Sequence, residues 1–247
     1  MIRIEDELGA AFTDVLLHRA SEGKRLIIVT GAGRSGTSAV ARVLHESGVT
    51  MGRDFGPPSE FNPLGFYEEL PVRELNQRIM ADCGMRSIDG WPERATVLSA
   101  AAAYGEAMAE LADASVGGWK DPRFCLTLES WLPHLPSPPR VVVCLRSPEA
   151  FVHSVVSIFG LTSREILEQW WANHLRRILD FVEEYRLEAT CVVYEDLVLR
   201  PEATVDRLSS FIDRPLDAGF VEPSLQQFAQ DVPERHMALY EEVRALS

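Results

Sequence analysis

The sequence has few cysteines, and none of them is spaced for a metal or a redox site. Its 247 residues include only Cys83, Cys125, Cys144 and Cys191, which lie far apart in the chain. No Cys-x-x-Cys pair or Cys/His cluster of the kind that binds zinc occurs. Cys144 and Cys191 each lie inside an apolar run, where a buried thiol is expected. This pattern predicts no metal site and favours a reducing compartment, the cytoplasm.

Basic residues are also scarce, and long apolar runs are absent. The chain carries 24 Lys and Arg against 37 Asp and Glu, a net charge of −13. Nucleic acids and anionic membranes are bound by basic faces, so neither is expected as a partner. No apolar run approaches the roughly 20 residues that a membrane span needs. Because charges occur throughout the stretch 1–23, it is not expected to act as a signal peptide. Its residues Ile4, Leu8, Phe12 and Val15 recur at helical spacing, which predicts an amphipathic helix packed on the domain.

Strand-like and helical segments alternate along the rest of the chain. Short, β-branched apolar runs are typical of strands that are covered on both faces of a parallel sheet. Such runs occupy Leu26–Thr30, Val141–Leu145 and Thr190–Tyr194. Amphipathic helical patterns occupy Thr37–Ser47, Arg164–Tyr185 and Pro201–Ile212. We therefore predict a three-layer α/β fold with a central, mostly parallel sheet, formed by residues 1–247 as one domain.

Three further segments fit neither regular element. Gly52–Glu69 is rich in proline and glycine, and a long loop inside a compact domain is usually functional. Pro133–Arg140 is interpreted as a stiff connector into the second strand. The C-terminal segment 213–247 receives no role from its sequence.

The turn "GAGRSGTS", Gly31–Ser38, follows a predicted strand and opens a predicted helix. In that context glycines let backbone N–H groups approach an anion at the helix N-terminus, so the turn predicts a phosphate site. Gly31, Gly33 and Gly36 satisfy the G-x-G-x-x-G pattern of NAD(P)-binding Rossmann proteins. That pattern also needs an acidic residue after a second strand, and Asp54, at about the right distance, lies in the Pro/Gly loop instead.

The same turn nearly satisfies the P-loop of kinases and ATPases. Gly31 and Gly36 have the required spacing, but Thr37 stands where that motif has its phosphate-binding lysine. A divergent P-loop kinase and a Rossmann-type NAD(P) protein therefore remain alternatives, each lacking one necessary residue. A third possibility is a non-enzymatic protein that keeps a nucleotide site without chemistry.

A third pattern matches the turn with all of its required residues present. Arg34 followed by Ser35-Gly36-Thr37-Ser38 resembles the loop of sulfotransferases that binds the 5′-phosphate of 3′-phosphoadenosine 5′-phosphosulfate (PAPS). That family holds the 3′-phosphate with an Arg at a strand end and a Ser eight residues later, at the start of the next helix. "VVVCLRSPEAFVHS" supplies Arg146 and Ser154 at this spacing. Arg offers a planar fork to a phosphate, and Ser adds a hydroxyl donor.

Three more segments resemble bacterial members of this PAPS-dependent sulfotransferase family. They are "FNPLGFYEE" at Phe61–Glu69, "GWKDPRFCL" at Gly118–Leu126 and "VVYEDLVLRPEATVDRLSSFI" at Val192–Ile212. The resemblance spans roughly Leu26 to Ile212. It implies a P-loop-like phosphosulfate-binding turn and transfer of a sulfuryl group from PAPS to a hydroxyl or amine of a small-molecule, lipid or carbohydrate acceptor. The product 3′-phosphoadenosine 5′-phosphate (PAP) would be released.

The resemblance also implies the site residues. Those expected to bind the donor are Gly33, Arg34, Ser35, Gly36, Thr37, Ser38, Arg146, Ser154 and Tyr194. Arg34 is expected to stabilise the leaving group, with Lys120 as a second cation, unless Lys120 is only an ion-paired lysine beside Asp121. Glu68 is expected to be the base, because Phe66 and Tyr67 would partly desolvate its carboxylate and raise its basicity. Glu60 and Glu69 are the alternatives.

Several other residues invite a role. His153 adjoins Ser154 and is interpreted as a packed or ligand-positioning residue, whereas His174 is expected in the core or on a helix surface. Trp119 or Trp91 is a candidate for the wall of the substrate pocket. The cytosolic animal enzymes return a basic tail to the 3′-phosphate, and here Arg235 is a weak substitute. The sequence indicates neither the acceptor nor the oligomeric state.

Overall fold

The computed structural model describes residues 25–60, 62–85, 91–113, 117–160, 163–222 and 231–246. Within these ranges the chain forms a four-stranded sheet, in which every neighbouring pair of strands is parallel. The strands are β1 (Ile27–Thr30), β2 (Gly118–Lys120), β3 (Arg140–Leu145) and β4 (Glu188–Val193), in the spatial order β2-β1-β3-β4. The helix expected in 1–23 lies outside the described residues.

Each central strand contributes side chains to both faces of the sheet. In β1, Ile28 belongs to the larger apolar core, whereas Ile27 and Val29 belong to the smaller one. In β3, Val141 and Val143 point to the larger core, with Val142 between them on the other face. Because successive side chains alternate across a strand, this division requires layers of helix on both faces.

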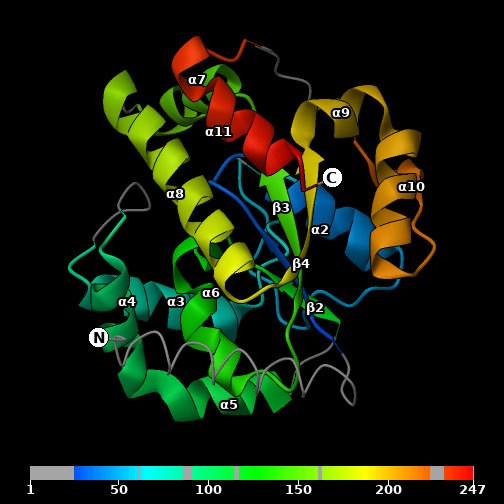
Figure 1. Ribbon diagram of the computed structural model, residues 1–247. Coiled ribbons are helices and arrows are strands. Elements are labelled where there is room, and N and C mark those ends of the chain that lie inside the picture. The colour runs from blue at the N-terminus through cyan, green and yellow to red at the C-terminus, as the bar shows by residue number, and fades with distance from the viewer. Residues whose placement is uncertain are drawn as a thin grey trace.

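Helices supply those layers. They are α2 (Thr37–Glu46), α3 (Leu70–Asp82), α4 (Arg94–Ala101), α5 (Gly105–Asp113), α6 (Phe124–Trp131), α7 (Pro148–Phe159), α8 (Arg164–Glu184), α9 (Tyr194–Leu199), α10 (Pro201–Ile212) and α11 (Glu234–Arg244). Helices α2 and α10 fill the smaller core, and the longest helix, α8, crosses the opposite face with α6 and α11 (Figure 1). The predicted three-layer α/β architecture with a parallel sheet is confirmed.

The predicted elements are close to those observed, with two differences. The strand β4 starts two residues earlier than predicted, at Glu188, and ends at Val193. Tyr194 therefore does not end the strand but begins α9. The strand β2 was not predicted, since its three residues contain Gly118 and Lys120 and show no apolar run. The described residues of the loop, 52–60 and 62–69, contain no helix or strand, as expected, apart from isolated bridges. The connector before β3 includes a short turn of 3₁₀ helix at Leu132–His134.

The strand order locates the region where a ligand is expected. From β1 the chain passes to β2 on one side and then to β3 on the other, so the connections leaving β1 and β3 diverge. In open parallel α/β sheets, ligands bind beyond the carboxyl ends of the strands at such a reversal of strand order. The predicted phosphate turn follows β1, and Arg146 follows β3, so the topology brings both to this point.

None of the described helices is by itself long and apolar enough to cross a membrane, although α7 and α8 taken together pass that test across a bend of 118°. The cysteines Cys125, Cys144 and Cys191 are buried, and Cys83 is half-buried; all four are free. The expected burial of Cys144 and Cys191 is confirmed.

The C-terminal segment contributes α11, which packs on α8 through an ionic cluster. Glu168 on α8 accepts hydrogen bonds from Arg235 (2.6 Å) and His236 (3.1 Å) on α11 and from Arg164 one turn earlier on α8 (2.7 Å). Burial acts to raise the pKa of Glu168, but these hydrogen bonds outweigh it and lower the pKa to about 2. The carboxylate thus helps to fix the end of the chain on the sheet layer.

Replacing Glu168 with Gln should therefore destabilise the protein in a pH-dependent way. At pH 7 we expect a loss of about 1 kcal/mol, because Arg164 and Arg235 are half exposed and solvent screens them. A depressed folded-state pKa stabilises the fold above the ordinary value of 4.5, and that stability is lost as the pH falls towards 2. Thermal unfolding of both proteins between pH 7 and pH 2.5 should show the difference shrinking. The exposed neighbour Glu165, changed to Gln, is the control; an equal effect there would contradict the prediction.

Candidate active site

The turn after β1 has the backbone geometry of an anion-binding loop. Gly36, immediately before α2, has φ +85°, and a Cβ placed on it would lie 2.3 Å from Cδ2 of Tyr194. Only glycine fits at this position, because the backbone is left-handed and the tyrosine ring lies directly against it. Arg34 also has a positive φ, 71°, although it is not a glycine. Such strain costs about 1–2 kcal/mol and tends to persist at functional sites.

A cavity of about 730 Å³ opens beside this turn, at the carboxyl ends of the strands. Of the predicted site residues, all but Ser35 line it; the side chain of Ser35 is buried behind the turn. Three acidic side chains, Glu60, Glu68 and Glu222, also line the cavity. Six cationic side chains outnumber them: Arg34, Arg42, Arg73, Lys120, Arg123 and Arg146. A net positive cavity in a protein of net charge −13 is the electrostatic signature of an anion site.

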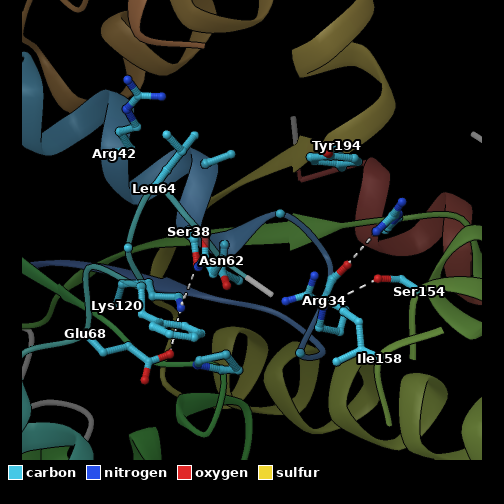
Figure 2. A pocket seen from close by; sticks show the side chains of 18 of the residues that line it. Arg34, Ser38, Arg42, Asn62, Leu64, Glu68, Lys120, Ser154, Ile158 and Tyr194 are labelled. Atoms are coloured by element: carbon cyan, nitrogen blue, oxygen red, sulfur yellow. Dashed lines mark hydrogen bonds and ion pairs between the residues drawn. The ribbon is translucent and has the colours of Figure 1, made fainter. Parts of the chain in front are cut away.

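One side of the cavity is formed by two arginines from distant parts of the chain (Figure 2). Arg34 Nε donates to Ser154 Oγ (3.4 Å), and an Nη of Arg146 donates to the carbonyl of Arg34 (3.1 Å). The Arg146 guanidinium lies 4.7 Å from the ring centroid of Tyr194. Ser154 is the seventh residue of α7, so it does not begin the helix as the resemblance implied. The predicted 3′-phosphate pair therefore lies next to the turn.

The surroundings of these arginines disfavour their positive charges. Burial lowers the pKa of Arg34, and the charge of Arg146 lowers it further. Burial likewise lowers the pKa of Arg146. A lowered pKa means that the surroundings disfavour the positive charge, and a bound anion would reverse this effect. The arrangement thus favours an anionic ligand on this side.

The other side of the cavity holds a buried ion pair (Figure 2). Lys120, 2% exposed, donates to Glu68 Oε1 (2.7 Å) and to Ser38 Oγ (3.2 Å). Asn62 Nδ2 also donates to Ser38 Oγ (3.0 Å). Lys120 thus bridges the turn that begins α2 and the carboxylate at the end of the Gly52–Glu69 loop. Its ion-pair partner is Glu68, not Asp121.

Glu68 is buried as expected, but its basicity differs from the expectation. Burial acts to raise its pKa, yet the charge and hydrogen bond of Lys120 and the charges of Arg123 and Arg73 outweigh burial. The net effect lowers the pKa below the ordinary value of 4.5. The prediction of a carboxylate made more basic by desolvation is wrong, because it did not include the cations around Glu68. Glu68 is ionised at neutral pH.

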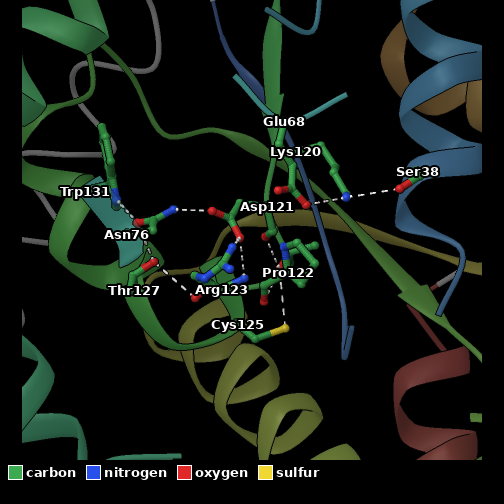
Figure 3. A network of polar contacts seen from close by, with 11 residues as sticks. Ser38, Glu68, Asn76, Lys120, Asp121, Pro122, Arg123, Cys125, Thr127 and Trp131 are labelled. Carbon is green, nitrogen blue, oxygen red and sulfur yellow. Dashed lines mark hydrogen bonds and ion pairs between the residues drawn. The ribbon is translucent and has the colours of Figure 1, made fainter. Parts of the chain in front are cut away.

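A second polar network holds the turn after β2 in place (Figure 3). Asp121, fully buried, accepts from the backbone N–H and an Nη of Arg123 (2.8 and 3.0 Å) and from Asn76 Nδ2 (3.0 Å). Asn76 Oδ1 in turn accepts from Thr127 (3.0 Å) and Trp131 (2.9 Å). Burial raises the pKa of Asp121, although Arg123 opposes the shift. This network fixes the position of Lys120 next to Asp121.

The alternative acids are less well placed than Glu68. Glu69 accepts hydrogen bonds from the backbone N–H groups of Arg53 and Asp54, which ties its carboxylate to the loop. Glu60 is exposed at the edge of the cavity. Asp54, the acid that a Rossmann reading would need, is exposed and does not line the cavity. The NAD(P) alternative is therefore not supported.

Other residues singled out in the sequence mostly lie elsewhere. His153 is exposed and not packed, because it faces away from the core on α7. His174 is buried as expected and reaches the cavity wall, and burial lowers its pKa to about 4. Trp119 stacks with Phe124 in the core and does not line the cavity.

Two further candidates are also absent from the cavity wall. Trp91 packs against the larger core instead. Arg235 is paired with Glu168, so it is no substitute for a 3′-phosphate cation. Sequence reasoning missed Asn62, Arg73 and Arg123 as cavity residues. Arg123 had a signal in the Lys-Asp-Pro-Arg segment, whereas Arg73 is one of two arginines on α3, a helix that was not predicted.

Comparison with known proteins identifies the family of the chain. A profile of the sulfotransferase family matches residues 27–218, whereas no curated protein matches the chain. Among solved structures, the chain is similar to the sulfotransferase from Alicyclobacillus acidocaldarius, with 15% identity over 91% of this chain and 94% of that one and a TM-score of 0.49. It is also similar to the sulfotransferase domain of the Synechococcus PCC 7002 olefin synthase, with 16% identity over 93% of this chain and 91% of that one and a TM-score of 0.49. A third similar structure is the sulfotransferase domain from the curacin biosynthetic pathway, with 20% identity over 89% of this chain and 83% of that one and a TM-score of 0.46. Because the profile covers well over half of its length, the chain belongs to the sulfotransferase family.

Proposed function

We propose that this protein transfers a sulfuryl group from PAPS to a hydroxyl or amine of a small-molecule, lipid or carbohydrate acceptor. One observation carries the proposal: Arg34, Arg146 and Ser154, from separate segments, meet at the glycine turn in a cavity of net positive charge. A donor with phosphate groups at both its 5′ and 3′ positions needs two anion sites, and our candidates for them are the glycine turn and the Arg146–Ser154 pair. Neither a P-loop kinase nor an NAD(P) protein predicts an Arg at the end of a later strand followed by a Ser eight residues on, as Arg146 and Ser154 stand here.

The residues fit the donor as follows. Gly33, Gly36 and the hydroxyls of Thr37 and Ser38 would hold the 5′-phosphate, together with the loop amides and the backbone at Ser35. Arg146 and Ser154 would hold the 3′-phosphate, and the ring of Tyr194 would contact the adenosine. When bound, PAPS supplies an activated sulfuryl group; the protein supplies position and charge. In-line transfer of this kind depends mainly on these two contributions.

Chemistry would then fall to three side chains. Arg34 and Lys120 would stabilise negative charge on the leaving group, because both are cations at the turn. Glu68 would take the proton of the acceptor, and its lowered pKa keeps it ionised for that purpose. Lys120 contacts both the turn and Glu68, so the same side chain would align the base with the donor.

Binding of PAP should test the donor directly. We expect calorimetric titration to show that PAP binds at least about tenfold more tightly than 5′-AMP. Only PAP has a 3′-phosphate that can accept charge-assisted hydrogen bonds from the protein. Arg146→Ala should remove most of this preference, whereas Arg176→Ala, an exposed residue on α8, should retain it. Equal affinity of the wild-type protein for PAP and 5′-AMP would reject PAPS and leave ATP and NAD(H), titrated in parallel, as alternatives. Turnover of PAPS with any acceptor would exclude a purely binding role.

We also propose that residues 1–247 form one sulfotransferase domain and that the protein works in the cytoplasm. The family match over 27–218 supports the first statement. The free cysteines support the second, since unpaired thiols are usual in a reducing compartment.

A further inference from the structure

Arg73 is a cavity residue that the proposed reaction does not use. It lies in the first turns of α3 and lines the cavity, and its charge helps to lower the pKa of Glu68. Its Nε is buried without a hydrogen-bond partner. Across the residues that the structure describes, its side chain makes no hydrogen bond or ion pair. A half-buried guanidinium in this state is prepared for an anion, since leaving it unpaired is unfavourable.

The neighbouring charges do not neutralise Arg73. Lys120 is paired with Glu68 at 2.7 Å, and Arg123 is paired with Asp121 at 3.0 Å. Glu68 and Asp121 thus have their close ion-pair partners in Lys120 and Arg123, and Arg73 acts on Glu68 only through its charge, without a close ion pair to a described residue. For an acidic ligand bound here, attraction to Arg73 would offset the repulsion from the Glu68 carboxylate.

The position of Arg73 separates it from the proposed donor groups. Arg34, Arg146 and Ser154 come from the segments after β1 and β3, whereas Arg73 comes from α3, which begins directly after Glu68 and Glu69. A Cβ placed on Gly56 would lie 3.2 Å from an Nη of Arg73, so the guanidinium packs under the Gly52–Glu69 loop. An anion on Arg73 would therefore lie on the Glu68 side, where the acceptor must present its reacting group.

The cavity that Arg73 lines also offers apolar surface for an organic acid. Leu64, Phe66 and Pro122 line the same cavity and offer apolar contact. Gln77, one turn after Arg73 on α3, adds an amide that can donate or accept a hydrogen bond. Apolar walls with a few placed polar groups are typical of small-molecule sites.

We propose that the acceptor is acidic: one molecule carries the hydroxyl or amine that Glu68 deprotonates and a carboxylate or phosphate that pairs with Arg73. This inference rests on the proposed sulfuryl transfer and specifies its acceptor class. Its chemistry is a charge-assisted, bidentate contact that a neutral analogue cannot make.

The test uses the full chain saturated with PAP, so that only the acceptor side is vacant. Matched compounds are titrated calorimetrically: glucuronate and glucose 6-phosphate against glucose, and 4-hydroxyphenylacetate against its amide. We expect at least one acid to bind about tenfold or more tightly than its neutral partner. The sugar acids distinguish a carboxylate from a phosphate as the preferred group.

Variants of Arg73 then identify the residue responsible. Arg73→Ala should reduce the preference to within about twofold, whereas Arg73→Lys should retain part of it because the charge remains. Arg78→Ala removes the same charge from an exposed position on α3 outside the cavity and should retain the full preference. PAP affinity should be unchanged in all three, and thermal unfolding monitors folding.

Three results would overturn the inference: equal binding of acids and neutral partners, no binding of any acid, or a loss of PAP affinity in Arg73→Ala as large as the loss of acid binding. The last result would assign Arg73 to the binding of PAP instead of the acceptor. Failure of the proposed function is distinguishable, because wild-type protein would then show no preference for PAP before any acceptor is added.

Discussion

Glu68→Gln is expected to lower the turnover of PAPS by about 10²–10⁴-fold while leaving PAP affinity within about threefold. Glutamine keeps the shape of the side chain, and its carbonyl can still accept the hydrogen bond from Lys120 that Glu68 accepts at 2.7 Å. It cannot take a proton from the acceptor. Single-turnover assays with any acceptor that supports transfer, together with calorimetric titration of PAP, would measure the two effects separately. Glu74→Gln, an exposed change on α3 outside the cavity, is the matched control.

The pH dependence gives a second test of the same role. Because the pKa of Glu68 is lowered, the base stays ionised down to pH values below 4.5. The acid limb of kcat/KM, which reports the free enzyme, should therefore lie below pH 4.5 and disappear in Glu68→Gln. An acid limb near neutral pH would assign the base to another group. Unchanged turnover in Glu68→Gln, with a loss in Glu60→Gln or Glu69→Gln, would transfer the role to that residue.

The elements that the sequence predicted well are those with strong local signals. The apolar runs before Thr30 and Leu145, and the helices at Thr37, Arg164 and Pro201, depend on periodicity and on glycine or proline at their ends. They suffice for a three-layer α/β fold. β2 has no such signal, since it is short and lies at an edge of the sheet, and its Lys120 is buried only because Glu68 pairs with it.

The candidate site was predictable to a similar extent. Motif spacing brought Arg34, Arg146 and Ser154 together correctly, because a parallel sheet gathers the carboxyl ends of its strands at one edge. The electrostatics of Glu68 were predicted in the wrong direction. A pKa depends on every charge nearby, and the position of Arg73 depends on how α3 packs, which no local pattern encodes.

Gly36→Ala is expected to abolish measurable PAP binding and to destabilise the fold more than a comparable change elsewhere. The left-handed backbone at φ +85° would itself cost about 1–2 kcal/mol with a Cβ present. The new methyl would also lie 2.3 Å from the ring of Tyr194. That ring packs beside Arg146, so relief of the clash must move either the turn or the aromatic wall of the cavity.

Gly84→Ala measures the cost of the left-handed backbone without a steric clash, and so separates the two contributions to the effect of Gly36→Ala. Gly84 has φ +79°, but a Cβ there would meet nothing within 4 Å, and it lies outside the cavity. Chemical unfolding should show a loss of about 1–2 kcal/mol for Gly84→Ala. Gly36→Ala should lose about 1–3 kcal/mol more, the usual range for overpacking.

In a Tyr194→Ala background, which is itself destabilised because Tyr194 is buried, Gly36→Ala should cost only the backbone strain. Removing the ring removes the clash, so the coupling between the two sites would be of the same size as the overpacking term. PAP binding should stay weak in the double variant, because the strained turn no longer presents its amides and Arg146 has lost the ring beside it. Equal destabilisation by Gly36→Ala and Gly84→Ala, with PAP binding intact, would show that the turn does not depend on close packing of Gly36 against Tyr194 and that the phosphate site lies elsewhere in the cavity.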